Sequence, residues 1–105
     1  MSATYETTVN VEAPARVLER LPLDIRDRQP GWRLVRHAPR TSLEYSLPVG
    51  LRSWGESIEI TVAGGSLRIV SRCRFPIIDW GRNARNVEVV RACIQRAREQ
   101  LSTTG

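Results

Sequence analysis

The sequence predicts a small α+β domain in the order β-α-β-β-β-β-α. Its elements would form a five-stranded antiparallel sheet with two helices on one face, one of them a long C-terminal helix. Segment 66–74 alternates between two kinds of side chain, which is the two-residue period of a strand. Segment 83–101 repeats apolar residues every three or four positions, as a helix does. The pair Gly64-Gly65 separates two alternating segments and is typical of a tight hairpin.

The C-terminal segment is the element around which the rest is organised. No Gly or Pro interrupts residues 82–102, and the charged side chains fall largely on one side. The apolar stripe on the other side consists of Val87, Val90, Ile94, Ala97 and Leu101. A lone amphipathic helix of this length is marginal in water, so the stripe needs a sheet to cover.

The N-terminal part predicts a strand followed by an interrupted helix. Residues 5–11 alternate apolar and polar side chains, and Pro14 suits a first helical turn. An apolar stripe of Val17, Leu18 and Leu21 follows. We expect Pro22 to break or kink this helix, which would resume briefly over 23–28. A turn is predicted at 29–31.

Four further strands are predicted over 32–37, 41–47, 54–62 and 66–74. In the first of these, Trp32 and Leu34 would lie on one face, opposite Arg33 and Val35. The third strand of the chain would present its apolar face through Leu43, Tyr45 and Leu47. Because the links are short, we expect sequential strands to be antiparallel neighbours. The first or third strand would be an exposed edge.

The glycine pair also predicts a register for the last hairpin. If Gly64 and Gly65 are its two loop residues, the residues facing each other are Ile60 and Ile69, Ile58 and Ser71, and Glu56 and Cys73. Glu56 would then point to the inner side, and Glu59 would lie diagonal to Arg68 and Arg72 on the outer side.

Composition narrows the class of protein. The 105 residues suffice for one domain, 1–105, with fraying expected at 1–4 and 102–105. All 16 basic residues are Arg and the net charge is +5, which permits an acidic partner without requiring one. No apolar run approaches the ~20 residues that span a bilayer, and no leader is recognisable, so we expect a cytoplasmic protein.

The two cysteines have no metal-ligand spacing. Cys73 and Cys93 stand far apart in the sequence, on the last strand and on the long helix, so we expect no metal and no cofactor. The two could nevertheless be close in the fold, and in the cytoplasm two buried thiols are the expected state of such a pair, with a disulfide as the alternative.

Segment 75–83 is the corner between the last strand and the helix. Asp79 or Asn83 would cap the helix, and Gly81 suits a positive φ. One interpretation is a purely structural corner in which Trp80 packs. The other is a ligand site at the end of the sheet, whose candidate residues are Trp54, Glu56, Arg74, Asp79, Trp80 and Asn83.

The same segment carries a family resemblance. Ser71, Arg74, Asp79, Gly81 and Asn83 resemble a bacterial family of unknown function whose signature is Ser-x-Ser-Arg, then Asp-x-Gly-x-Asn-x-x-Arg-Ile. Cys73 stands in place of the second Ser, and Asn86 stands where Arg is frequent. Pro30-Gly31-Trp32 is also similar. The resemblance implies shared structure without a known chemistry.

The order of elements resembles two known folds, the TATA-binding-protein-like fold and the Bet v 1 (START)-like fold. In both, a curved antiparallel sheet grips a C-terminal helix. This resemblance implies a helix-grip domain, and a fold by itself does not determine a function.

Three classes of function follow, and catalysis is not among them. We find no nucleophile elbow, phosphate loop or metal motif, and we interpret His37 as a surface residue, so we expect no enzyme. The first hypothesis is a module of helix-grip type that binds a small apolar or amphipathic ligand or a protein. The second is nucleic-acid or anion binding through an Arg-rich sheet face, with Arg68, Arg72 and Arg74 on the outer strand face together with Arg33 and Arg82. The third is a structural domain that forms a homodimer.

Overall fold

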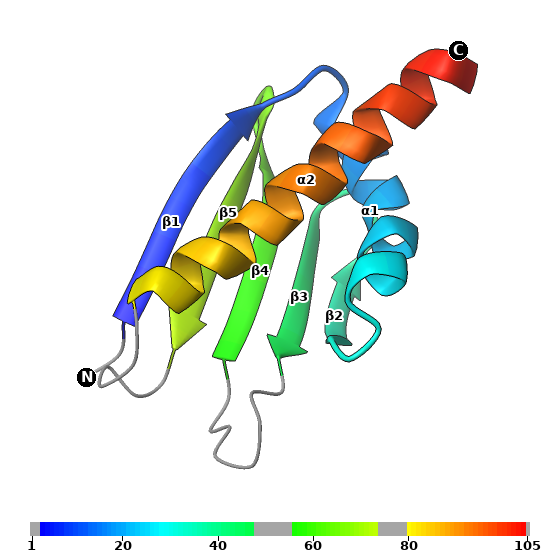
Figure 1. The fold of residues 1–105 in the computed structure, drawn as a ribbon. Helices are drawn as coiled ribbons and strands as arrows, with labels where there is room; N and C mark the ends of the chain where they lie inside the picture. Colours follow the sequence, from blue (N-terminus) through cyan, green and yellow to red (C-terminus); the bar gives the residue numbers. More distant parts are fainter. Residues whose placement is uncertain (1–2, 48–55, 74–79, 105) are drawn as a thin grey trace.

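The computed structural model describes residues 3–47, 56–73 and 80–104, with side-chain burial given for 4–47, 56–72 and 84–102. The elements are β1 (Ala3–Asn10), α1 (Pro14–Arg28), β2 (Arg33–Ala38), β3 (Ser42–Leu47), β4 (Glu56–Ala63), β5 (Ser66–Cys73) and α2 (Trp80–Thr104). This order and the antiparallel sheet confirm the predicted fold class. Both helices lie on one face of the sheet, and α2 crosses it diagonally (Figure 1).

The sheet has the strand order β1-β5-β4-β3-β2, and every pairing is antiparallel. Strands β2 to β5 are therefore sequential neighbours, as predicted, and β1 returns to pair with β5. The edges are β1 and β2. The alternative in which the third strand forms an edge is wrong for β3, because its second side pairs with β4 after the short β2–β3 turn.

The last hairpin has the predicted register. Ile60 faces Ile69, Ile58 faces Ser71 and Glu56 faces Cys73. The loop consists of Gly64 and Gly65, and Gly64 has φ of 61°, a left-handed conformation that glycine adopts without a steric penalty.

One local expectation is wrong in its stronger form. Pro22 does not break α1, because Leu21 and Ile25 on either side of it are fully buried and hold the helix against the core. Strand β2 contains an irregularity that its sequence pattern does not predict. Its register with β3 shifts between Leu34 and Arg36, which leaves Val35 51% exposed at a β-bulge.

The core lies between the inner face of the sheet and the two helices. The predicted stripe of α2 is buried at Val87, Val90, Ile94 and Ala97, while Leu101 is half-buried. Together with α1 and the strands, these form one cluster. Burying each large aliphatic side chain there is worth roughly 1.5–3 kcal/mol before the loss of conformational entropy is counted.

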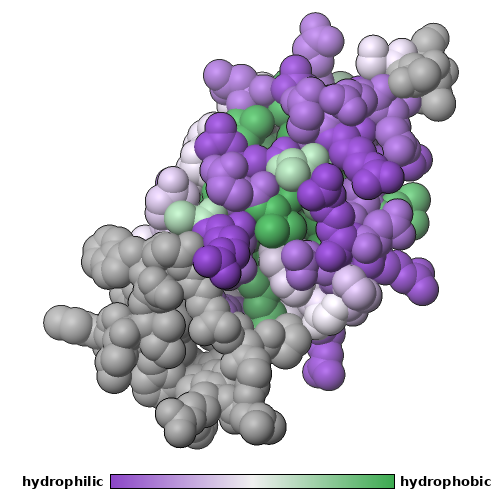
Figure 2. All heavy atoms as spheres, in the orientation of Figure 1, coloured by the Kyte–Doolittle hydropathy of each residue, from purple (hydrophilic) through white to green (hydrophobic). Residues whose placement is uncertain are grey.

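The surface of the molecule on the side of the helices is mostly hydrophilic, and the apolar core lies between the helices and the sheet. Figure 2 shows hydrophilic side chains surrounding a narrow band of hydrophobic ones on this face. On the opposite face of the sheet, Val70 is 4% exposed, although its position in the alternation predicts a solvent-facing side chain. Its cross-strand neighbours Glu6 and Glu59 stand on either side of it.

Candidate functional site

Of the six candidate ligand-site residues, Glu56 is the one whose side chain the structure describes. It opens β4 on the inner face, faces Cys73 and Leu47 on the adjacent strands, and is 4% exposed. Trp54, Arg74 and Asp79 lie outside the described residues. Trp80 and Asn83 belong to α2, but their side chains are not described. The predicted convergence of these six residues therefore stays a prediction.

Glu56 takes part in a polar group inside an otherwise apolar layer. Asn86 of α2 donates from Nδ2 to Glu56 Oε1 at 3.3 Å, across the boundary between sheet and helix. Ser71 is fully buried and lies diagonal to Glu56 on the same inner face. We call Glu56, Ser71 and Asn86 the inner polar cluster. A buried carboxylate needs such hydrogen bonds to offset the loss of hydration.

Of the candidate nucleic-acid residues, Arg33, Arg68 and Arg72 lie on the outer face of the sheet, while Arg82 belongs to α2 and Arg74 lies outside the described residues. Arg68 donates to both carboxylate oxygens of Glu6, with Nε–Oε2 and Nη2–Oε1 distances of 2.9 Å. This bidentate interaction lowers the pKa of Glu6 and raises that of Arg68. Arg33 and Arg72 are exposed, whereas the side chains of Arg74 and Arg82 are not described.

Acidic residues alternate with these arginines. Arg36 bonds to Glu44 and to Glu59, the latter with a distance of 3.3 Å between Nη2 and Oε2. Glu59 faces Val70 between Arg68 and Arg72, which confirms the predicted diagonal. The described outer face thus carries alternating positive and negative charges rather than one basic patch.

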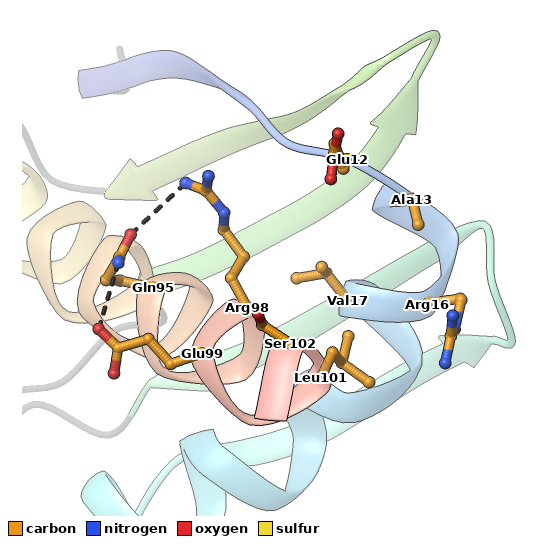
Figure 3. A pocket seen from close by; sticks show the side chains of 9 residues that line it. All are labelled: Glu12, Ala13, Arg16, Val17, Gln95, Arg98, Glu99, Leu101 and Ser102. Atoms are coloured by element: carbon orange, nitrogen blue, oxygen red, sulfur yellow. Dashed lines mark hydrogen bonds between the residues drawn. The ribbon is translucent and has the colours of Figure 1, made fainter. Parts of the chain in front are cut away.

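A large hollow of about 610 Å³ lies between the start of α1 and the last turns of α2. In Figure 3, Glu12 and the guanidinium of Arg98 reach toward the same side, with Val17 and Leu101 nearer the helices. Gln95 donates to Glu99 at 3.2 Å and accepts from Arg98 at 3.5 Å. Two acidic and two basic residues line this cleft, so its charges balance, and its α2 side chains bond to one another.

A second hollow of about 370 Å³ lies beside the cleft, over the exposed side of α1. It is lined mostly by charged residues, namely Arg16, Glu19, Arg20 and Arg40, together with Leu23 and Leu101. Arg40 Nε lies 3.7 Å from Glu19 Oε2, so these walls also pair with each other.

A hollow of about 360 Å³ has different walls. It lies between the second half of α1 and strands β2 and β3, and we call it the aromatic groove. Its lining residues are Pro22, Leu23, Arg26, Pro30, Trp32, Leu34 and Tyr45. The rings of Trp32 and Tyr45 are tilted by 56° with centroids 6.1 Å apart, a favourable geometry for aromatic pairs.

The aromatic groove exposes apolar surface to solvent. Leu23 is 56% and Leu34 is 38% exposed, whereas Tyr45 is 3% exposed. Among the described lining residues, Arg26 is the one that is charged, and the described part of the chain offers it no hydrogen bond or ion pair. Concave apolar walls with few polar groups are the usual composition of small-molecule sites.

Sequence reasoning missed the aromatic groove. The pattern predicts the turn before Trp32, but it also predicts that Pro22 breaks the helix. An uninterrupted α1 brings Pro22, Leu23 and Arg26 beside β2. An apolar Leu23 on the side of α1 away from the buried stripe was the signal available.

Two kinds of feature are absent from the described residues. No group of three or more His, Cys, Asp and Glu side chains is arranged to hold a metal ion. No helix in the same residues is long and apolar enough to cross a bilayer.

The comparisons with known proteins add little. No protein-family model matches the chain, and no curated protein sequence matches it significantly. The crystal structure of Ara h 8.0201 is similar to it with a TM-score of 0.47 and 12% identity, covering 100% of both chains. Likeness of this degree carries no argument about function. The resemblances to the bacterial family and to helix-grip folds therefore rest on the motif and on the order of elements.

Proposed function

We propose that this protein is a non-enzymatic module that binds a small ligand in the aromatic groove. The observation that carries the proposal is the pairing of exposed Leu23 and Leu34 with the Trp32–Tyr45 pair around one hollow. Its 360 Å³ lies in the range of small-molecule sites. Covering this apolar surface gives a ligand a favourable free energy of binding.

The charge of the groove selects the ligand class. Arg26 adds a guanidinium to walls that are otherwise apolar or aromatic. A carboxylate is the matching group, because guanidinium–carboxylate bonds are about twice as strong as neutral ones. The proposed ligand therefore has an apolar, preferably aromatic, body and one carboxylate. Arg26 also lies in the last turn of α1, where a positive charge interacts favourably with the helix dipole. Its contribution to helix stability and its contribution to ligand binding therefore need separate tests.

The experiment uses 2-naphthoate as the probe and its neutral counterpart 2-naphthylmethanol as the comparison. Both are titrated into ¹⁵N-labelled protein and followed by amide and indole chemical shifts. We expect 2-naphthoate to shift Trp32 and Leu34, and Arg26→Gln to weaken its binding about tenfold. Arg28→Gln is the matched control, since Arg28 is exposed on the same helix end but does not line the groove.

Separate results test separate parts of this proposal. Absence of shifts with both probes, together with no bound small molecule in native mass spectra of protein from its own cells, contradicts the ligand-binding function. Equal affinities for the two probes contradict the carboxylate preference alone. Shifts around Asn86 instead of Trp32 would move the site to the inner polar cluster, where Glu56 would accept from a donor group.

Self-association is a second candidate function. Strand β1 pairs with β5 along Ala3–Asn10, and its other hydrogen-bonding edge faces away from the sheet. An open edge is a template for a further strand. Sedimentation equilibrium over a hundredfold range of concentration tests it: a mass that stays at 11.9 kDa throughout contradicts self-association.

The nucleic-acid hypothesis has weaker support. Arg68 and Arg36 are engaged with glutamates on the outer face, so fewer guanidinium groups remain for phosphates. A binding affinity that falls steeply with salt would favour it.

A further inference from the structure

One hydrogen bond just beyond the end of β1 shows which of its backbone groups point away from the sheet. Val11 N donates to Gly65 O at 3.2 Å, which places residue 11 among those that bond toward β5. In an antiparallel ladder this role alternates along the strand. Residues 5, 7 and 9 therefore also bond toward β5. Residues 4, 6, 8 and 10 direct their N–H and C=O groups to the open side.

In the described part of the chain, the edge of β1 carries few of the features that block pairing, Glu6 being its one charged residue. Its sequence ATYETTVN contains no Lys, Pro or Gly, and its register with β5 is unbroken. The other edge, β2, is interrupted by the bulge at Val35. A second strand therefore finds a longer and more regular template on β1 than on β2.

We infer that β1 pairs antiparallel with β1 of a second copy, about a two-fold axis at Thr7. This inference rests on the proposed self-association and specifies its interface. The outward groups allow three central pairings, Glu6 with Glu6, Glu6 with Thr8, and Thr8 with Thr8. The first sets like charges opposite each other, which destabilises a pair. The third aligns only residues 6–10, whereas Glu6 with Thr8 aligns residues 4–10.

The side chains fit this register. Tyr5, which is 38% exposed on the inner face, comes opposite Val9 of the second copy. They form a pair without hydrogen bonds between them, where side chains approach more closely. Aromatic and β-branched residues are favourable cross-strand partners. Val9 packs against the core, so the contact would extend the apolar layer from one copy to the other.

The helices leave room for the second copy. In Figure 1, α2 begins beside the N-terminal end of β1 and runs away from this edge toward α1. A two-fold axis at Thr7 would place the second α2 at the opposite end of the joined strands. The two sheets would then form one continuous sheet with the helices on a common face.

A cysteine at the axis tests the register directly. Thr7 would face Thr7 of the second copy, with Cα atoms about 4.5 Å apart, which is within the range of a disulfide. We expect Thr7→Cys to give a covalent dimer on mild oxidation, with mass spectrometry identifying a disulfide-linked peptide that joins the substituted positions of the two copies. Thr8→Cys is the matched control, because it would face Glu6, and it would cross-link efficiently only in the Thr8–Thr8 register.

A proline tests the use of the edge without oxidation. Thr8→Pro removes an outward N–H that the protein's own sheet does not use, so the circular dichroism spectrum should be kept. We expect the dimer dissociation constant to rise at least tenfold, with Thr8→Ala as control.

A wild-type protein that is monomeric at all concentrations overturns self-association and this inference together. A dimer that neither forms the disulfide in the Thr7→Cys variant nor responds to Thr8→Pro overturns the register and leaves self-association standing.

Discussion

At the scale of single residues, the buried titratable side chains of Tyr45, Cys93 and Asp24 influence one another between the sheet and the helices. Tyr45 is 3% exposed, and burial followed by the nearby Cys93 raises its pKa to about 12. Burial also raises the pKa of the Cys93 thiol, and Asp24 raises it further, while Arg28 and Arg96 act against this. Cys93 is a free, buried thiol, so the sequence-based expectation of an unpaired core cysteine is confirmed for it.

The raised pKa of Tyr45 predicts a loss of stability in alkali. The unfolded chain releases the phenol proton near pH 10, whereas the folded protein holds it up to about pH 12. The folded state thus binds more protons in this window, and its free energy of unfolding falls as the pH rises from 10 to 12. Urea unfolding at pH 9 to 11.5 measures this slope. Tyr45→Phe should reduce it.

Asp24 is a buried carboxylate that pairs with Arg20 within α1, and Arg20 also contacts α2. Its Oδ2 lies 3.8 Å from Arg20 Nε, and Arg20 Nη2 also donates to Gln100 of α2. Among the described residues, neither Asp24 Oδ2 nor Arg20 Nε has a hydrogen-bond partner, so the geometry of the pair is incomplete.

We therefore expect Arg20→Met alone to lower the free energy of unfolding by about 2 kcal/mol, because it leaves a buried carboxylate without its partner. Adding Asp24→Leu should restore most of the loss. Urea denaturation of the two single variants and the double variant gives the coupling. Strictly additive effects would show that the two side chains do not interact.

At the scale of elements, local patterns and packing contribute differently. The hairpin of β4 and β5 has the register that its glycine pair predicts, since a two-residue loop admits few geometries. Helix α1 has the opposite character. Pro22 predicts a break, but burial of residues on both sides of it outweighs the missing hydrogen bond.

Pro22 should accordingly be a destabilising residue within α1. We expect Pro22→Ala to raise the free energy of unfolding by roughly 1–3 kcal/mol, since alanine restores an N–H donor and relieves the steric clash. Thermal unfolding followed by circular dichroism measures it. Pro30→Ala, in the turn after the helix, is the control and should have a smaller effect. A lower stability of the Pro22 variant would mean that its ring is needed for packing in the aromatic groove.

At the scale of the whole molecule, one apolar cluster links both helices with the sheet. It includes Leu18 of α1, Ile60 of β4 and Ile94 of α2, all of them nearly inaccessible to solvent. Helix α2 contacts β1, β5 and α1, so the N- and C-terminal parts of the chain depend on each other.

This cluster predicts cooperative unfolding. Ile94→Ala should lower the free energy of unfolding by roughly 2–5 kcal/mol, because it opens a cavity between helix and sheet. Tryptophan fluorescence and circular dichroism should give one shared midpoint in both the wild type and the variant. Separate midpoints would show that the helices unfold independently of the sheet. Ser102→Ala, at an exposed position of the same helix, is the control.

In the candidate site, the sequence predicts only those residues whose place follows from a pattern of neighbouring residues. The alternation of β4 and its hairpin register predict that Glu56 points inward, and the structure confirms this. The aromatic groove has only the exposed Leu23 as a local signal, because α1 and β2 meet there only after the chain has turned back. Its charged residue, Arg26, is one of many arginines in the sequence, and nothing local distinguishes it.

Periodicity acts over a few residues, and for that reason the sequence alone specifies the type of each element, the inward faces of β3, β4 and β5, and the stripe of α2. Other features depend on contacts between distant segments. They are the pairing of β1 with β5, the burial of Val70 on the outer face and the position of Pro22 and Trp32 in the lining of one groove. These emerge from packing, where many small contributions compete and burial of the shared core outweighs local preference. The open edge of β1 and the aromatic groove both arise in this way.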